Sequence, residues 1–452
     1  MPEPEENDHP ISALEDAVFI STDDHAIEPA DLWQRYMPSK FKDQAPRYLE
    51  DEISGYWQIE DRKLRAVANA SVAGRPPWEY GLEPTSYEQL RLGCYDVHAR
   101  VDDMNVGGYV AAMCFPNTPG CAGQTFREGK DKALMYACIQ AWNDWYIDEW
   151  CGAYPGRFIP LAILPVWDVT LCVDELRRVK KKGCNAFSMV AIPPKADLPS
   201  FHSDYWNPLW AFSNDEGMTV AVHIGDTTSV ASSLDAPYDT WICGFPVSLF
   251  YVASDILWSP ILRKYPQLKF VMSEGGAGWI PHMYDRVDFV YQQHRWWTHQ
   301  DFGDKLPSEV LKEHMFTCIL DDPTAVEMRH RVGVDTMTWE CDYPHSDSIW
   351  PRGPETLWRD FKKFKATPDE IEKITHRNAM RAFNFDPFKH ARREDITVGA
   401  LRAQAKAKGV NPGFLFNREN PGFTEPPGGI RKEFVTMANR EKYGVLAASW
   451  KS

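Results

Sequence analysis

The stretch that decides the fold is Val18-Phe-Ile-Ser-Thr22, a short β-rich run that leads directly into Asp23-Asp24-His25. Similar short apolar runs recur along the chain and alternate with longer stretches of helical pattern. Most of these runs are apolar throughout, which is typical of parallel strands that are buried on both faces. We expect eight strands, at Val18–Thr22, Tyr109–Phe115, Phe158–Leu164, Ala186–Val190, Thr219–His223, Lys269–Ser273, Phe316–Leu320 and Thr338–Cys341.

The stretches between these runs have the length and pattern of helices. Examples are Asp131–Trp150, Val169–Lys182, Pro208–Glu216 and Gly278–His294. Eight repeats of strand and helix predict an α/β fold of the (β/α)₈ TIM-barrel class. The alternative, a doubly wound open sheet, requires a glycine-rich phosphate loop after its first strand. Asp23-Asp24-His25 occupies that position instead, which favours the barrel.

Three segments do not follow the strand–helix repeat. Residues 1–16 are predicted to form an acidic N-terminal arm, and the barrel domain is predicted to span residues 17–390. About residues 40–95 form a long insertion after the first strand, rich in Pro, Gly, Tyr and Trp, and we expect it to cap the active-site end of the barrel. Residues 391–452 contain Pro-Gly turns and few aliphatic residues, and are predicted to be an extended arm that packs on the barrel or on a partner subunit.

The composition restricts the partners of the protein. A net charge of −15 argues against nucleic acids and anionic membrane surfaces, which both require basic patches. No window of eighteen apolar residues predicts a membrane span, and the acidic N-terminus does not resemble a secretory signal. The 10 cysteines are scattered and form no CxxC pair, which is typical of reduced thiols in a cytoplasmic protein.

Potential metal ligands stand where the strands end. Asp23 and His25 are two residues apart, so both side chains can point to the same side of the first strand. The fifth strand ends in His223, the sixth in Glu274 and the eighth in Asp342. One such residue alone is more often a helix cap or a hydrogen-bonded structural residue. In a barrel, however, these ends converge on one axis, and the sequence therefore predicts a metal site.

Each residue of this set has an expected role and an alternative one. Asp23, His25 and His223 are expected to be ligands, whereas Asp342 is expected to bind the metal and to accept a proton. Glu274 is either a ligand of a second metal, a partner that orients His223, or a cap of the helix near Trp279. The other candidates for substrate binding or acid–base catalysis are His345 and His282, although an ordinary helical residue is an equally good interpretation of His282.

The sequence also resembles the amidohydrolase-2 family, which belongs to the metal-dependent TIM-barrel hydrolases. The resemblance begins at Asp23-Asp-His-Ala-Ile-Glu28-Pro-Ala-Asp-Leu-Trp33 and includes Glu274-Gly-Gly-Ala-Gly-Trp279-Ile-Pro281 and Asp342-Tyr-Pro-His345. It ends near Arg377-Asn-Ala-Met-Arg-Ala-Phe383 and covers about residues 17–386.

The resemblance implies one divalent ion, zinc or manganese, held by the first-strand pair, the His of strand five and the Asp of strand eight. The first-strand pair is Asp-x-His rather than His-x-His, and Glu274 stands where many family members have His. Both differences make the site richer in carboxylate, which also suits manganese and iron.

Three functions remain open at this stage. The first is hydrolysis or nonoxidative decarboxylation of a small organic acid or carbonyl compound. The second is a non-heme diiron monooxygenase, in which two irons share the carboxylate-rich site and Glu274 bridges them. The third is a non-catalytic interaction barrel. We expect a small-molecule substrate in the first two cases, and a homo-oligomer in all three.

Overall fold

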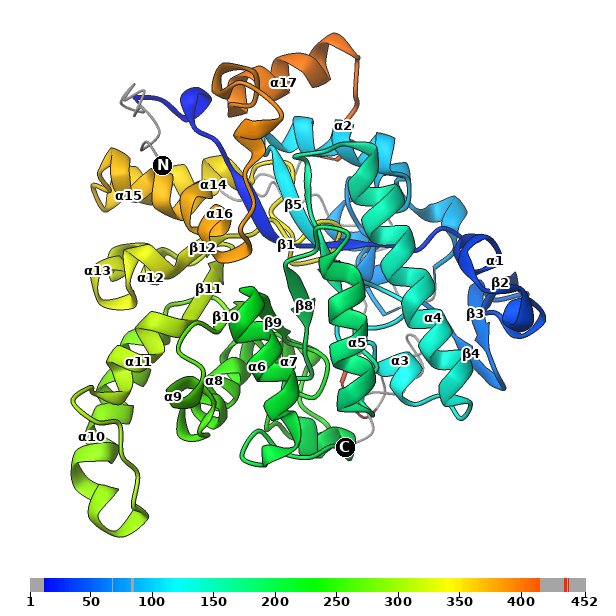
Figure 1. The fold of residues 1–452 in the computed structure, drawn as a ribbon. Coiled ribbons are helices and arrows are strands. Elements are labelled where there is room, and N and C mark those ends of the chain that lie inside the picture. Colours follow the sequence, from blue (N-terminus) through cyan, green and yellow to red (C-terminus); the bar gives the residue numbers. More distant parts are fainter. Residues whose placement is uncertain (1–11, 67, 83–84, 415–434, 437, 439–452) are drawn as a thin grey trace.

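The computed structural model describes residues 12–66, 68–82, 85–414, 435–436 and 438. Its main sheet is parallel throughout and closes into a barrel (Figure 1). The strands are β1 (Ile20–Ala26), β5 (Ala111–Pro116), β6 (Phe158–Ile159), β7 (Leu161–Ala162), β8 (Ala186–Ser188), β9 (Thr219–His223), β10 (Lys269–Ser273), β11 (Met315–Ile319) and β12 (Met337–Trp339).

The sheet order β6-β5-β1-β12-β11-β10-β9-β8-β7 explains the closure. β6 pairs with β5 and β7 pairs with β8, and only Pro160 separates β6 from β7. Proline has no N–H to donate to a neighbouring strand, so the pairing is interrupted at this residue. β6 and β7 are thus two halves of the third predicted strand, and all eight predicted strands of the (β/α)₈ barrel are confirmed.

Helices surround the barrel. The longer ones are α2 (Val97–Gly107), α4 (Lys132–Asp144), α5 (Val169–Lys180), α6 (Asn207–Glu216), α8 (Leu249–Trp258), α10 (Ile280–Thr298), α11 (Pro307–His314), α14 (Gly353–Lys363) and α17 (Val398–Ala407). The shorter ones are α1 (Leu32–Tyr36), α3 (Gln124–Arg127), α7 (Tyr238–Gly244), α9 (Ile261–Lys264), α12 (Pro323–Glu327), α13 (Arg329–Val332), α15 (Pro368–Glu372) and α16 (Asn378–Phe383). The four helical stretches named from the sequence are α4 with its π-helical continuation Trp145–Cys151, α5, α6 and α10.

The core is continuous from the strands to these helices and contains much of the tryptophan of the chain. Trp142, Trp145, Trp150 and Trp339 are fully buried in it. The high aromatic content therefore serves mainly packing. Within the described residues, no single helix is long and apolar enough to cross a membrane. Helix α7 and the segment Pro246–Trp258 have that length and composition only when they are taken together, and the chain bends between them.

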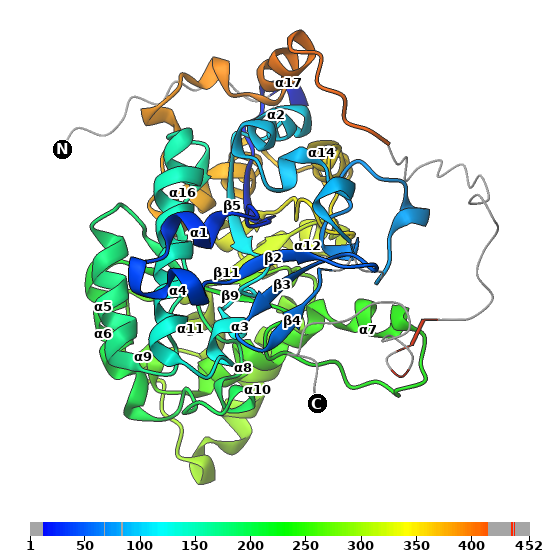
Figure 2. The same cartoon turned by 90° about the vertical axis from the view of Figure 1, so that its right-hand side faces the viewer.

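The insertion after β1 contains a small antiparallel sheet of β2 (Arg47–Glu50), β3 (Gly55–Ile59) and β4 (Arg62–Leu64). In Figure 2 this sheet lies over one end of the barrel, with α7 projecting beside it. Farther along the insertion, Leu82 packs against Tyr238 and Trp241 of α7. The insertion and α7 therefore meet at this end of the molecule.

The described parts of both arms pack on the barrel of their own chain. Leu14 is buried, and the Val398 N–H of α17 donates to the Ala17 carbonyl at 2.9 Å. α17 lies against α2 and buries Val398, Leu401 and Ala405. Of the predicted N-terminal arm, residues 1–11 lie outside the described residues, as does most of the predicted C-terminal arm beyond Phe414.

Candidate metal centre

Four side chains from three strand ends meet inside the barrel. Asp23 and His25 come from β1, His223 ends β9, and Asp342 follows β12. His25 Nε2 lies 3.5 Å from Asp23 Oδ1 and 3.5 Å from Asp342 Oδ1. His223 Nε2 lies 3.4 Å from Asp23 Oδ2. The convergence expected from the sequence is therefore present in the structure.

Six polar atoms of this cluster make no regular hydrogen bond within the part of the chain that the structure describes. They are both carboxylate oxygens of Asp23 and of Asp342 and the Nε2 atoms of His25 and His223, and all are buried. A buried polar atom without a partner is costly, and most are satisfied in native proteins. A cation in contact with these six atoms would satisfy them together, so the residues fit a divalent metal ion.

Hydrogen bonds to backbone carbonyls orient the imidazoles of His25 and His223. Nδ1 of His223 hydrogen-bonds the carbonyl oxygen of Ile224. Burial lowers the pKa of His25, and a hydrogen bond to the Pro116 carbonyl opposes that shift. A ring nitrogen that donates to a carbonyl leaves the other nitrogen free for a metal, the usual arrangement behind a ligating histidine.

Glu274 lies on the metal-facing side of His223. Its Oε2 is 3.3 Å from His223 Nε2, whereas the Ile224 carbonyl occupies Nδ1. One interpretation of the sequence was that Glu274 orients His223. The Ile224 carbonyl holds Nδ1 instead, and Glu274 approaches the opposite nitrogen, Nε2. Glu274 does not cap α10 either, because the N-cap residue of this helix is Trp279 and the described residues provide no side-chain capping hydrogen bond there.

The backbone is in an uncommon conformation at two of these carboxylates. Glu274 has φ 59° and Asp342 has φ 57°, in the left-handed region that non-glycine residues seldom adopt. Such residues cluster at functional sites, where the surrounding structure holds them in place. At Asp342 the support is visible: its N–H donates to the Asp23 carbonyl at 2.8 Å.

Four carboxyl groups crowd the site; those of Asp23, Asp342 and Glu340 are buried and that of Glu274 is partly buried. Burial raises the pKa of Asp23, and it raises the pKa of Glu274 to about 8. Burial, together with the carboxylates of Glu274 and Asp23, raises the pKa of Asp342, and similar causes act on Glu340. Like charges this close do not all ionise by themselves. A divalent cation would allow several of them to be charged at once.

His345 joins the cluster and His282 does not. His345 Nδ1 is 2.9 Å from Asp342 Oδ1, and its ring centroid is 3.7 Å from that of His25. Burial and the neighbouring His223 lower the pKa of His345 to about 3, so its imidazole is neutral. His282 is exposed on α10, with its ring 6.2 Å from that of Phe250. The acid–base role considered for His282 is therefore not supported by its position.

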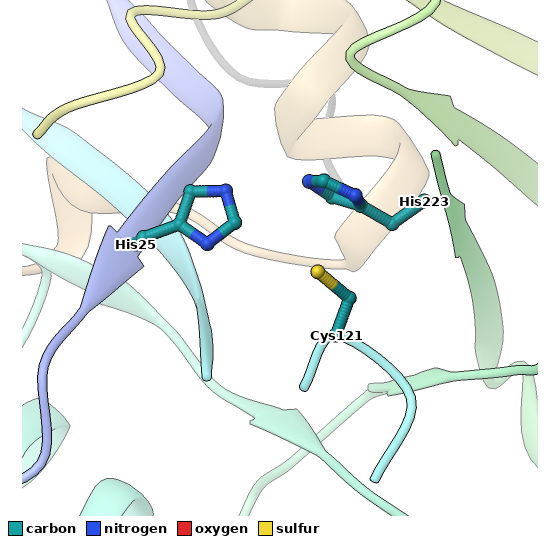
Figure 3. Close-up of side chains that lie close together, drawn as sticks. All are labelled: His25, Cys121 and His223. Atoms are coloured by element: carbon teal, nitrogen blue, oxygen red, sulfur yellow. The ribbon is translucent and has the colours of Figure 1, made fainter. Parts of the chain in front are cut away.

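Two residues of the site were not indicated by the sequence analysis. Glu340 is buried and accepts a hydrogen bond from the Glu274 N–H at 3.1 Å. It precedes Asp342 by two residues, so the spacing rule that selected Asp23 and His25 could have found it. Cys121 lies in the loop after β5, where no spacing distinguishes it. Figure 3 shows its sulfur pointing toward the space between His25 and His223.

Asp24 and Glu28 support the site without joining it. Asp24 accepts hydrogen bonds from the hydroxyls of Ser21 and Tyr109, at 2.8 and 3.0 Å. The Glu28 carboxylate accepts the N–H groups of Asn117 and Thr118, at 3.1 and 2.9 Å, and the indole N–H of Trp142 at 2.9 Å. Glu28 thereby fixes the start of the loop that carries Cys121.

A cavity of about 590 Å³ opens onto the cluster. His25, His223, Glu274 and His345 line its inner end. Its outer walls are mainly apolar and aromatic and include Leu82, Ile224, Tyr238, Trp241, Phe245 and Trp279. Among the described residues that line it, none is Lys or Arg.

The aromatic walls come from a segment that the sequence analysis did not single out. The rings of the insertion at Tyr56, Trp57, Trp78 and Tyr80 do not line the cavity. Trp57 instead packs edge-on against Trp33, with ring centroids 4.7 Å apart. The insertion contributes Asn69, Ala70 and Leu82, and α7 with the residues after it supplies the rings.

The chain is similar to known proteins in sequence and in fold. The chain is 22% identical over 355 residues to 2-amino-3-carboxymuconate-6-semialdehyde decarboxylase of Caenorhabditis elegans, covering 66% of this chain and 84% of that protein. Two solved structures are similar in fold. An amidohydrolase of Mycobacterium avium subsp. paratuberculosis K-10 has a TM-score of 0.64 and 19% identity, over 81% of this chain and 99% of that chain.

The second structure is 5-carboxyvanillate decarboxylase of Novosphingobium aromaticivorans with bound manganese, with a TM-score of 0.57 and 15% identity, over 81% of this chain and 97% of that chain. The family model described as Amidohydrolase matches residues 95–385, which is more than half of the chain. The chain therefore belongs to the amidohydrolase family.

Proposed function

We propose that this protein is a metal-dependent carboxy-lyase that decarboxylates a small aromatic or unsaturated carboxylic acid without an oxidant. The observation that carries the proposal is the buried cluster of Asp23, His25, His223 and Asp342, whose unpaired atoms face a cavity with apolar walls. The relatives named above support it, because two of the three are decarboxylases and one of these holds manganese.

The cavity explains why a metal would be required. A carboxylate substrate meets no Lys or Arg among the described residues that line the cavity. A bound divalent ion would hold the carboxylate and an adjacent oxygen of the substrate. The walls formed by Trp241, Phe245 and Trp279 would then pack against the flat remainder of the substrate and exclude water.

The His345–Asp342 pair is positioned to deliver the proton that decarboxylation requires. His345 lines the cavity, and its Nδ1 lies 2.9 Å from the Asp342 carboxylate. A proton shared by this pair would move to the substrate carbon that bears the carboxylate. The bond between that carbon and the carboxylate then breaks, its electron pair stays on the carbon, and CO₂ leaves. The net reaction consumes one proton and requires no oxidant.

The second candidate is the diiron monooxygenase, and the position of Glu274 favours it. Its carboxylate lies on the metal-facing side of His223, and its ligand atom groups with those of His25, Asp342 and His345 within 4.8 Å. A carboxylate in such a place can bridge two ions. This alternative differs from the first in its requirement for O₂ and in its metal stoichiometry.

The experiment uses protein that is depleted of metal and reconstituted separately with Mn²⁺, Zn²⁺ or Fe²⁺. Each form is incubated without O₂ with a panel of hydroxybenzoic and unsaturated aliphatic acids, and CO₂ release is measured. We expect release from at least one acid, and its loss in His345→Asn with the metal content unchanged. Turnover only in the presence of O₂ would select the monooxygenase, and turnover only of esters, amides or lactones would select a hydrolase.

A further inference from the structure

Cys121 lies at the candidate centre, close to the imidazoles of His25 and His223. Its Sγ and one nitrogen each of His25 and His223 all lie within 4.8 Å of one another. In Figure 3 the sulfur points toward the gap between the two rings. Among the described residues, no group forms a hydrogen bond with the buried Nε2 atoms of the two histidines. The unpaired nitrogens are a second observation, independent of the cysteine, that points to a ligand in this gap.

The loop that carries Cys121 is held firmly. Its start is fixed by the Glu28 carboxylate, which accepts the N–H groups of Asn117 and Thr118. Gly120 has φ +75°, a conformation that favours glycine, and its N–H donates to the Asn117 carbonyl at 3.0 Å. The Gly123 N–H donates in turn to the Gly120 carbonyl at 2.9 Å. The tight turn therefore sets the direction of the Cys121 side chain.

Cys121 differs from the other cysteines of the chain. All ten are free; Cys121 is partly buried and lines the cavity, Cys243 is exposed, and the others are buried. The sulfur faces the same gap as the imidazoles, while the carboxylates of Asp342 and Glu274 group with His25 and His345. The sulfur and the two carboxylates thus belong to two groups of potential ligand atoms, and His25 is common to both groups.

We propose that Cys121 is a direct ligand of the metal centre and that its thiolate shifts the metal preference from manganese toward zinc, iron(II) or cobalt. This inference rests on the proposed metal centre. Thiolate ligands favour softer ions, whereas carboxylate and water suit manganese. Binding through sulfur releases the thiol proton, so metal uptake by the wild-type protein is accompanied by one more released proton than uptake by a variant without the thiol.

The test is a titration of metal-free full-length protein with Co²⁺, followed by absorption spectroscopy. Visible bands report the cobalt centre itself, and a near-ultraviolet charge-transfer band reports a cobalt–thiolate bond. We expect both in the wild type and in the control Cys243→Ser, and loss of only the near-ultraviolet band in Cys121→Ser. Serine keeps the size of the side chain, and circular dichroism checks that the variant folds. In a competition, Cys121→Ser should also lower the preference for Zn²⁺ over Mn²⁺ by about tenfold or more.

Each other outcome overturns the inference in a distinguishable way. Visible bands at one equivalent of cobalt without a thiolate band, or with a band that persists in Cys121→Ser, would refute the role of Cys121 and leave the metal centre intact. Absence of any cobalt bands would refute the metal centre and the thiolate ligand together.

Discussion

The carboxylate of Asp342 contacts two imidazoles of the site, and its main chain has an uncommon conformation. Its carboxylate lies 3.5 Å from His25 Nε2 and 2.9 Å from His345 Nδ1, so it contacts both a metal-facing imidazole and the imidazole of the proposed proton donor. Its main chain is left-handed, with φ 57°, and its N–H donates to the Asp23 carbonyl. The strand β12 ends at Trp339, so the two residues between it and Asp342 lie outside the strand.

At the residue scale, the first prediction concerns Glu274→Gln, which keeps the size and hydrogen bonding of the side chain and removes its charge. In a mononuclear site we expect the ratio of metal to chain to stay near one, with a loss of about 10–100-fold in metal affinity or activity. Elemental analysis and activity assays measure the two quantities, with the exposed Glu313→Gln as the matched control. A wild-type ratio near two that falls to one in Glu274→Gln would show that Glu274 bridges two ions.

The site could be predicted from the sequence only where a residue ends a strand. Asp23, His25, His223 and Asp342 could be proposed because the carboxyl ends of barrel strands converge. Cys121 could not, because its position depends on a turn at Gly120 and on contacts of Glu28 that lie 89 and 90 residues apart in sequence. His282 was a wrong candidate because helical phase, and not spacing along a strand, decides that it faces solvent.

At the scale of elements, Glu28 connects β1 to the loop after β5. Replacing it by Ala leaves two backbone N–H groups and the Trp142 indole N–H without their acceptor. We expect Glu28→Ala to lower the free energy of unfolding by about 2–4 kcal/mol and Glu28→Gln to lower it less. Urea unfolding measures both, and Glu327→Ala on the surface of α12 is the control. Equal stability of Glu28→Ala and wild type would contradict this role.

A second prediction at this scale concerns His376 in the π-helical turn Lys373–Arg377. Burial, reinforced by Arg393 and Arg377, lowers the pKa of His376 to about 3. In the unfolded chain the pKa is about 6.5, so the unfolded state binds the extra proton between these two values. The free energy of unfolding therefore falls as the pH decreases from about 6.5 toward 3.

We expect His376 to account for about 2 kcal/mol of the stability that is lost between pH 7 and pH 5. Unfolding of metal-free protein at both pH values measures this loss, which should be smaller in His376→Gln than in wild type. The exposed His390→Gln should behave as wild type. An identical loss in His376→Gln would contradict the prediction, whatever the absolute stability of the variant.

Strands were easier to predict than the elements around the cavity. The eight apolar runs have a composition that buried parallel strands require, and each was found in the sheet. The interruption at Pro160 follows from the missing N–H of proline and was visible in the sequence. The role of α7 was not, because its rings reach the cavity through contacts with Leu82 of the insertion and Val435 near the C-terminus.

At the scale of the whole molecule, we propose a homo-oligomer, from two exposed tryptophans and the long C-terminal segment. Trp296 and Trp297 of α10, the helix that projects at the lower left of Figure 1, are 75% and 68% exposed. Exposed apolar side chains of this size are typical of interaction surfaces. Light scattering at micromolar concentration should show a dimer or a larger assembly, and a monomer would refute the proposal.

To test whether the C-terminal arm contributes to association, the arm must be shortened without damage to the barrel. α17 buries apolar residues against α2, so removal of the chain from residue 391 onward would damage the core. Truncation after Phe414 keeps this helix. If the arm carries the association, the shortened protein should dissociate at concentrations where wild type remains assembled.

The central claim is that this amidohydrolase-family barrel holds a divalent metal ion through Asp23, His25, His223 and Asp342. The most direct test is elemental analysis of the purified protein, with the ratio of metal to chain, beside His25→Ala, His223→Ala and the control His98→Ala. The account predicts about one equivalent of metal in wild type and His98→Ala, and its loss in the two site variants. Metal content that is unchanged in both His25→Ala and His223→Ala would contradict it.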